Sequence, residues 1–386
     1  MQVTRIRHEA EWDSLESDWN CLARGVPFRA WAWMRNWWRH FSDDNQLFVL
    51  TVRDDGGTLV GVAPWYLANS ASKGRALRFI ASGQVCSDYL SLLATEAHED
   101  AVISAIASWL IAANRGRQNG DTSNETPIPV GDSDRWDLLE LDGISATDRP
   151  TAKLIEQLVE QGCVVNRREG LNCWRIELPD TWDAYLGTMS KSHRKQIRRV
   201  ENRMLDSGRA VLHTIESLDD HHRAMQTLVD LHQRRRLSLN QPGCFADAKF
   251  DGFLHAAAAD LLKTSQLELQ ILELDGTPAA AEFHLVGNGV VYAYQAGVDP
   301  ERLDDEPGRI MNVAVIKRAI ENQYRAFDFL RGDEPYKAHW RAEPQSLVQL
   351  RVVPTHVAAR VRYGVWLAGD AMKNLLRGSL NLAGMH

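Results

Sequence analysis

An acidic residue within an apolar run is the first feature of this sequence that suggests chemistry. Asp328 stands between two phenylalanines in the run at residues 327–330. Burial disfavours a charged carboxylate and raises its pKa towards the range in which a general base works near neutral pH. We therefore take Asp328 as the first candidate for a catalytic base, with a hydrogen-bonded structural carboxylate as the alternative.

Four further side chains extend this candidate site. Glu282 and His284 are two residues apart among apolar neighbours, so in a strand they share one face and are alternative bases. Tyr336 can donate a proton, and Lys337 can bind a phosphate or carboxylate. Residue types alone leave acid and base unassigned, and Asp328 and Lys337 are the first choices for substitution.

These residues require a strand, a helix and a second strand to position them. The Val- and Tyr-rich run at 290–297 predicts a strand, and Pro307 and Gly308 predict the start of a helix with apolar residues at helical spacing. Residues 327–330 predict the next strand, which completes a βαβ unit. The free amides at such a helix start suit an anion.

The rest of the second half predicts a mixed α/β fold. Strands are expected at 172–178, 267–273, 279–286 and 346–353, and helices at 181–205, 217–236 and 250–262. The dipeptides at 275–276 and 288–289 are hairpin signals. The predicted helix around residues 191–203 carries six cations, Lys191, Arg194, Lys195, Arg198, Arg199 and Arg203, and is either a solvated basic face or an anion-binding one.

The first half predicts a similar order of elements. A Trp-rich helical region at 9–41 precedes strands at 46–53, 59–67, 76–81 and 88–93, a helix at 99–113, a loop at 114–135, a strand at 136–141, a helix at 150–161 and a strand at 163–166. The Trp-rich helix is expected to fill a core, with stacking on a substrate as the alternative. The hairpins that begin near Arg53 and Glu273 are alike, which suggests a duplicated domain with the site in the second copy.

Composition limits the class of protein. The chain has 386 residues, 44% hydrophobic and 25% charged, which is enough for two globular domains. A net charge of −7 argues against a generic DNA-binding protein. No signal peptide or membrane-spanning run is recognisable, and the five cysteines have neither disulfide nor zinc-site spacing. We expect a cytoplasmic protein without a metal.

The second-half motifs together resemble a known family. The tyrosine-rich strand, the Pro-Gly helix start, Phe-Asp-Phe-Leu-x-Gly and Tyr-Lys-x-x-Trp, over about residues 180–345, resemble the GNAT-like acyltransferases of the CelD (cellulose-biosynthesis) group, which are similar to the Fem peptidyl-transferases. The resemblance implies two tandem GNAT-like domains, the first degenerate: residues 1–170, residues 171–356 and an amphipathic tail at 357–386. The tail is expected to pack on the body, with membrane-surface attachment as the alternative.

The resemblance also implies roles for single residues. The pyrophosphate of the donor, acyl-CoA and above all acetyl-CoA, would lie at Gly308, Arg309 and Ile310, although the family's full glycine-rich loop is not present. Tyr336 would protonate the leaving thiolate. The remaining substrate contacts would come from Tyr294, His284, Trp340, Arg194 and Lys195.

Three functions follow from this sequence. The first is transfer of an acyl group from acyl-CoA to an amine of a sugar or amino-acid-like acceptor, in polysaccharide or cell-envelope synthesis. The second is a Fem-like transfer from aminoacyl-tRNA, which the basic helix favours. The third is a non-catalytic accessory protein in exopolysaccharide assembly.

Overall fold

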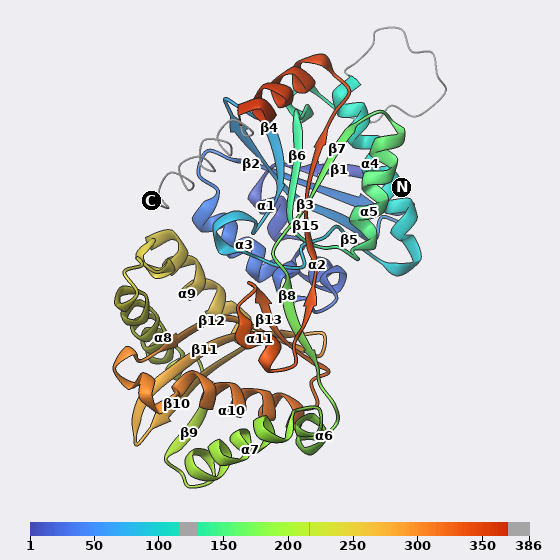
Figure 1. Ribbon diagram of the computed structural model, residues 1–386. Coiled ribbons are helices and arrows are strands. Elements are labelled where there is room, and N and C mark those ends of the chain that lie inside the picture. The colour runs from blue at the N-terminus through green and yellow to red at the C-terminus, as the bar shows by residue number, and fades with distance from the viewer. Residues whose placement is uncertain (116–129, 216, 370–386) are drawn as a thin grey trace.

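Two mixed sheets organise the protein. The computed structural model describes residues 1–115, 130–215 and 217–369. The first sheet has the order β1-β2-β3-β4-β6-β15-β7 with β5 beside β3, and the second has the order β14-β8-β13-β12-β11-β10-β9. Figure 1 shows the two sheets one above the other, each with helices against it. The mixed α/β fold predicted from the sequence is therefore confirmed.

The strands have the following bounds. Those of the first sheet are β1 (Gln2–Ile6), β2 (Gln46–Arg53), β3 (Leu59–Ser70), β4 (Gly74–Phe79), β5 (Leu93–Ala94), β6 (Leu138–Ser145), β7 (Val164–Glu169) and β15 (Leu347–Val353). Those of the second sheet are β8 (Cys173–Glu177), β9 (Ala210–Ile215), β10 (Leu267–Leu274), β11 (Thr277–Gly287), β12 (Val290–Val298), β13 (Ala326–Arg331) and β14 (Glu343–Gln345).

The α-helices occupy the connections between these strands. They are α1 (Glu9–Asp13), α2 (Glu16–Ala23), α3 (Trp31–Phe41), α4 (Glu99–Arg115), α5 (Arg149–Glu160), α6 (Trp182–Gly187), α7 (Lys191–Val200), α8 (Leu218–Ser238), α9 (Ala248–Lys263), α10 (Pro307–Glu321) and α11 (Pro335–His339).

The same order of elements occurs twice. In the first half β2, β3, β4, α4, β6, α5 and β7 follow one another, and in the second half β10, β11, β12, α10, β13, α11 and β14 do so. In both series the third and fourth strands pair in parallel, β4 with β6 and β12 with β13. This repetition agrees with the duplication inferred from the two hairpins.

Each sheet receives one strand from beyond its own series. β8 follows β7 in the chain but lies between β13 and β14 of the second sheet, whereas β15 follows β14 but lies between β6 and β7 of the first. At the crossing the amide of Gly170 donates to the carbonyl of Leu347 at 2.9 Å. The division at residue 356 stays a prediction about domains, but the strand at its end belongs to the first sheet.

The two dipeptides predicted as hairpin turns form such turns in the structure. Asp275 and Gly276, and likewise Asn288 and Gly289, all have positive φ values, between 48° and 78°, as a two-residue turn of the primed kind requires. These turns fix the register of β10 with β11 and of β11 with β12.

Three predicted elements differ from the structure. Residues 9–41 form three helices, because the αL residue Arg24 ends α2 and a 3₁₀ turn at Pro27–Arg29 precedes α3. Residues 181–205 divide at Ser190, the N-cap of α7, and continue past α7 as a π-helix at Glu201–Leu205. Residues 88–93 are not a strand as a whole, since only Leu93 and Ala94 pair with β3. The predicted loop at 114–135 lies mostly outside the described residues.

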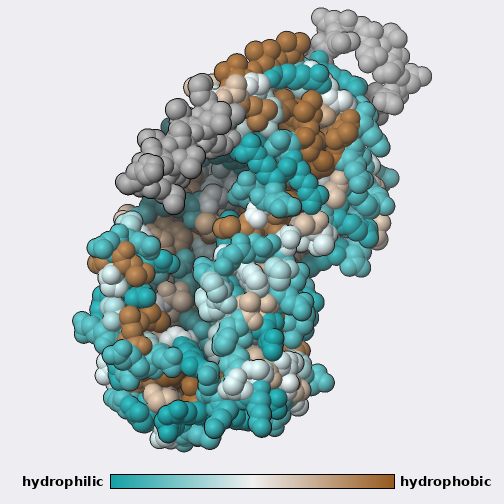
Figure 2. Space-filling model, in the orientation of Figure 1, coloured by the Kyte–Doolittle hydropathy of each residue, from teal (hydrophilic) through white to brown (hydrophobic). Residues whose placement is uncertain are grey.

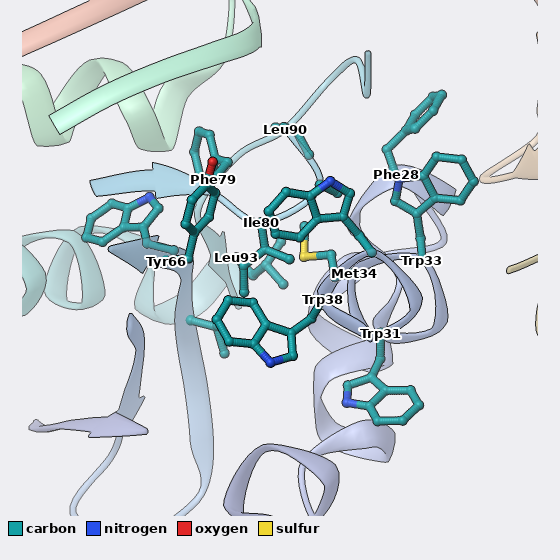
Figure 3. Packing of buried hydrophobic residues seen from close by; sticks show 14 of the residues in the cluster. Phe28, Trp31, Trp33, Met34, Trp38, Tyr66, Phe79, Ile80, Leu90 and Leu93 are labelled. Atoms are coloured by element: carbon teal, nitrogen blue, oxygen red, sulfur yellow. The ribbon is translucent and has the colours of Figure 1, made fainter. Parts of the chain in front are cut away.

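Aromatic packing joins the two halves into one core. Trp31, Trp33, Trp37 and Trp38 of α3 are at most 8% exposed, which confirms that this helix fills a core. Figure 3 shows Trp33 and Phe28 among the buried residues around α3. The ring of Trp33 lies 4.8 Å from Phe253 of α9, and Phe28 lies 5.7 Å from Tyr292 of β12. The first half therefore packs directly on the strand that bears the candidate site.

The described part of the tail packs on the first half. Residues 357–369 are helical. Arg362 pairs with Asp137 at 2.8 Å, and the guanidinium of Arg351 lies 4.2 Å from the ring of Trp366. Packing on the body is confirmed for this segment, whereas residues 370–386 lie outside the described part of the chain.

Candidate active site

The second sheet has a branch point at Tyr292 and Asp328. β12 and β13 pair in parallel at only three positions, the last of which is Tyr292 with Asp328. β12 continues to Val298, while β13 shifts register between Asp328 and Arg331 and follows β8. Leu330 and Gly332, with φ values of 59° and 122°, turn the chain there. Figure 2 shows a recess on this face of the molecule, between α9 and α11.

Asp328 is fully buried at this branch point. Its Oδ2 accepts a hydrogen bond from the hydroxyl of Tyr89 at 2.5 Å, and its Oδ1 accepts one from the amide of Leu330 at 2.8 Å. Burial raises the pKa of Asp328 to about 7, against the opposing effects of those two hydrogen bonds and of the Arg175 charge. The environment therefore gives this carboxyl the pKa of a base that works near neutral pH.

Tyr89 comes from the first half and was not anticipated from the sequence. It lies in the segment 82–92, 239 residues away from Asp328 in the chain. Arg29 Nε donates to the carbonyl of Tyr89 at 2.6 Å, and the amide of Leu90 donates to the carbonyl of Gly143 at 2.9 Å. A tyrosine at this position has no local signal, because its partner is chosen by the packing of the two halves.

An ion pair fixes the same segment to the end of β13. Arg331 Nε lies 2.6 Å from Oδ1 of Asp88, and its Nη2 donates to the carbonyl of Ser87 at 2.9 Å. Burial raises the pKa of Asp88, and the Arg331 charge opposes that rise. These contacts place the segment 82–92 directly over the branch point.

Lys337 of α11 lies beside the turn that follows the branch point. Its Nζ donates to the carbonyls of Leu330, Arg331 and Gly332 at 3.0 to 3.1 Å and lies 2.9 Å from a carboxylate oxygen of Glu334. The side chain is 3% exposed. All three ammonium protons therefore have acceptors within the protein, and Lys337 holds the turn after β13.

Glu282, His284 and Tyr336 form a second group on the opposite face of the sheet. Glu282 Oε2 and His284 Nε2 are 2.5 Å apart, and His284 Nδ1 is buried without a hydrogen-bond partner among the described residues. Burial, with the Glu282 charge next, raises the pKa of Tyr336. Because successive side chains of a strand alternate between faces, Phe327, which contacts His284, points away from the side of Asp328.

The two tyrosines of β12 lie on the side of the first half. Tyr292 has its ring 5.9 Å from that of Tyr89. Tyr294 donates its hydroxyl to the carbonyl of Val85 at 2.7 Å, again in the segment 82–92. The predicted substrate role of Tyr294 stays a prediction, and its hydroxyl has a partner inside the protein.

The predicted donor site lies at the start of α10. Glu306 precedes the helix with a φ of 55° and gives no side-chain cap. Pro307 has no amide proton, and the amides of Arg309 and Ile310 donate to the Glu306 carbonyl at 2.9 and 3.1 Å. Within this first turn the Gly308 amide therefore remains for an anion or water. Arg309 donates to Gln196 of α7 at 2.8 Å and pairs with Glu306 at 3.3 Å. Gly308 and Arg309 are partly exposed, whereas Ile310 is buried in the core.

Two acids beside this helix are neutralised. Asp305 pairs with Arg302 at 3.0 Å, and Glu306 pairs with Arg309. These two carboxylates therefore oppose an anion at the start of α10 less than unpaired carboxylates would.

The predicted residues of α7 and Trp340 have different environments. Arg194 and Lys195 are exposed, while Trp340 is 4% exposed and its carbonyl accepts the Tyr185 hydroxyl at 2.7 Å. His193, which the sequence did not single out, lies with its ring 3.8 Å from that of His339 in α11. Burial, with His339 next, lowers the pKa of His193 to about 4. α7 thus contacts the start of α10 and the end of α11.

Metal-ligating clusters and membrane-spanning helices are two further features that bear on function. Among the described residues, no group of three or more His, Cys, Asp or Glu side chains is arranged to hold a metal ion. No helix in the same part of the chain is long and apolar enough to cross a membrane.

Comparison with known families identifies the second half. Residues 191–338 match the family model of the acetyltransferase (GNAT) domain. This stretch contains the branch point, α10, and α11 up to Ala338. A GNAT-like acetyltransferase domain, as the second-half motifs predicted, is thereby confirmed. The search of curated proteins found no match.

Solved structures share the fold of almost the whole chain. A conserved protein of unknown function from Bacteroides thetaiotaomicron is 11% identical with a TM-score of 0.55, and the match covers 91% of this chain and 100% of that one. FemX is 11% identical with a TM-score of 0.59, over 90% and 97% of the two chains. The C-terminal domain of a putative lysylphosphatidylglycerol synthetase from Agrobacterium fabrum is 10% identical with a TM-score of 0.53, over 92% and 96%. At these identities the likeness concerns the fold.

Proposed function

We propose that this protein transfers an acyl group, foremost acetyl, from acyl-CoA to an amine of a sugar or amino-acid-like acceptor. The observation that carries the proposal is the branch point, where a buried carboxyl with a pKa of about 7 lies at the last position at which β12 and β13 pair. Attack on a thioester requires the neutral amine, so a base of this pKa is suited to the reaction.

The start of α10 supports acyl-CoA as the donor. Its first turn has no side-chain cap, and the positive end of the helix dipole lies there together with Arg309. A Cβ at Gly308 would lie 3.7 Å from Val298, in ordinary van der Waals contact. In this proposal Gly308, Arg309 and Ile310 hold the pyrophosphate.

Calorimetry tests the donor site. Acetyl-CoA is titrated into wild-type protein and into Arg309→Ala, with Arg318→Ala from the last turn of the same helix as the matched control. We expect the wild-type protein to bind acetyl-CoA with micromolar affinity and Arg309→Ala to bind it at least about tenfold more weakly. A tenfold loss corresponds to roughly 1.4 kcal/mol, as expected for one lost charge-assisted contact. Binding that is absent from the wild-type protein would remove acyl-CoA as the donor.

The basic face of α7 favours an aminoacyl-tRNA donor as the second function. Lys191, Lys195 and Arg199 of α7, and Arg203 just after it, are exposed, and no ion pair involving them occurs within the described residues. FemX and the putative lysylphosphatidylglycerol synthetase share this fold. Transfer that RNase abolishes and that acetyl-CoA does not support would establish this alternative.

The cellular setting follows from the proposed reaction. We place the protein in the cytoplasm, in the synthesis of a polysaccharide or cell-envelope precursor, as the CelD-like motifs suggest. A non-catalytic role in the same assembly predicts that Asp328→Asn leaves the polysaccharide phenotype of cells unchanged.

A further inference from the structure

We propose that Tyr89, which the first half supplies, is the catalytic residue that takes the proton from the acceptor amine and passes its own hydroxyl proton to Asp328. This inference rests on the proposed acyl transfer. It makes the active site a joint product of both halves, although the family match covers residues 191–338 alone.

The buried position of Asp328 is the first reason. Its side chain is 0% exposed, so a substrate held in solvent-accessible space does not touch the carboxylate. Of its two oxygens, Oδ1 accepts the Leu330 amide and Oδ2 accepts the Tyr89 hydroxyl. Tyr89 is partly exposed. The phenol oxygen is therefore the atom through which this carboxyl and an acceptor can exchange a proton.

The way in which Tyr89 is held is the second reason. Its φ of 59° is a conformation that a bulky residue rarely adopts, at a cost of roughly 1–2 kcal/mol. Arg29 on its carbonyl, the Asp88–Arg331 pair before it and the Leu90 amide after it fix this conformation. The hydroxyl is thus positioned in advance, as a proton relay requires.

The charged groups around Tyr89 and Asp328 allow a proton to pass from Tyr89 to Asp328 and back again. The groups that face Tyr89 and Asp328 are Asp88 from the same segment, Arg331 from β13, Cys173 and Arg175 from β8, Tyr292 from β12 and Arg29 from the turn before α3. Arg175 favours the ionised carboxylate, and Asp88 opposes it. Near neutral pH both protonation states of Asp328 are populated.

The proton balance of the step is complete. The amine nitrogen forms a bond to the thioester carbonyl carbon, and its proton passes to the Tyr89 oxygen as the Tyr89 proton passes to Oδ2 of Asp328. Collapse of the adduct breaks the carbon–sulfur bond and releases the CoA thiolate. The thiolate then takes one proton from solvent, and Asp328 returns the proton it received to solvent through the Tyr89 hydroxyl, so that amine and thioester become amide and thiol.

The test compares Tyr89→Phe with a matched tyrosine elsewhere. Tyr324→Phe is the control, because Tyr324 also donates to a carboxylate, Glu268 at 2.8 Å, away from the branch point. Release of the CoA thiol is followed with acetyl-CoA and a panel of amino sugars and amino acids as acceptors, over pH 5 to 9. Binding of acetyl-CoA and the unfolding temperature are measured for each variant.

For Tyr89→Phe we expect kcat to fall about 100-fold, within the usual range for proton transfer, with little change in the affinity for acetyl-CoA. The acid limb of kcat/KM should move to higher pH, because the hydrogen bond that favours the ionised Asp328 is lost. Tyr324→Phe should keep the wild-type rate and pH profile. Tyr89→His, which retains a proton-transfer group, should recover part of the rate with a new limb near the pKa of histidine.

Three outcomes contradict the inference in different ways. Wild-type rate and an unmoved acid limb in Tyr89→Phe would show that the hydroxyl takes no part in proton transfer. A loss of rate that follows only the unfolding temperature, with the acid limb unmoved and no recovery in Tyr89→His, would make Tyr89 a structural contact between the halves. A wild-type protein that transfers no acyl group from acetyl-CoA would overturn the proposed function itself.

Discussion

Arg331, at the end of β13, and Asp88, in the first half, form a short ion pair with 2.6 Å between Nε and Oδ1. The Asp88 side chain is 1% exposed and that of Arg331 is 23% exposed. A carboxylate this deeply buried depends on its cation, because removing one partner leaves an uncompensated charge.

Arg331→Met should therefore lower the free energy of unfolding by about 3–5 kcal/mol, as expected for a broken buried pair. The additional change Asp88→Asn should recover part of that loss, since the orphaned charge is then removed. Urea denaturation of the two single variants and the double variant measures the coupling. Purely additive effects would show that the pair contributes little to the contact between the halves.

Lys337 offers a test that separates structure from catalysis. Lys337→Met leaves three carbonyls without their shared donor, so we expect a loss of about 2–4 kcal/mol in the free energy of unfolding. If the lysine acts only by holding the turn after β13, kcat of the folded variant should stay within about tenfold of the wild-type value. A much larger loss of kcat at full folding would instead support the catalytic role predicted from the sequence.

Local signals predicted much of the fold. The turn at Asn288 and Gly289 was predictable because two residues with positive φ values specify a hairpin without help from the rest of the chain. The start of α10 at Pro307 was also predictable from local sequence, because proline is favoured at the first position of a helix. By contrast, residues 347–353 were recognised as a strand, but their pattern does not say which sheet they complete.

The site was predictable only in its second half. Asp328 was recognisable as an acid in an apolar strand, and its burial bears this out. Tyr89 lay in a run predicted as a strand, and the structure instead uses that run to reach Asp328 and Arg331. Contacts across more than 200 residues are set by the packing of the two halves, which a single sequence does not display.

The pKa of Asp328 predicts how stability varies with pH. The folded value is raised to about 7, whereas an unfolded aspartate has a pKa near 3.9. Between these values the folded state holds a proton that the unfolded state has lost. The contribution of Asp328 to the free energy of unfolding should therefore fall as pH rises from about 4 to 7, by at most about 1.4 kcal/mol per pH unit.

Asp328→Asn should flatten this part of the stability curve, as measured by urea denaturation at several pH values. Asp275→Asn is a control of opposite sign, because hydrogen bonds from Arg209 and Arg302 lower the pKa of Asp275 and make it stabilising at higher pH. An Asp328→Asn curve parallel to that of the wild type would mean that this carboxyl has an ordinary pKa in the folded protein.

The exchange of β8 and β15 predicts that the two halves unfold together. β15 lies between β6 and β7, so the first sheet is incomplete until the chain has passed through the second sheet. β8, which directly follows the last strand of the first series, lies between β13 and β14 of the second sheet. Val352 of β15 is 0% exposed, and a charge there would remove apolar burial and desolvate a carboxylate in the first half. Val352→Asp should therefore destabilise both sheets, although it lies beyond the last strand of the second.

Urea unfolding followed by tryptophan fluorescence, by far-UV circular dichroism and by a thiol probe on Cys173 should give coincident midpoints, lowered together in the variant. A midpoint for Cys173 that stays at the wild-type value would show that the second sheet keeps its stability without the first.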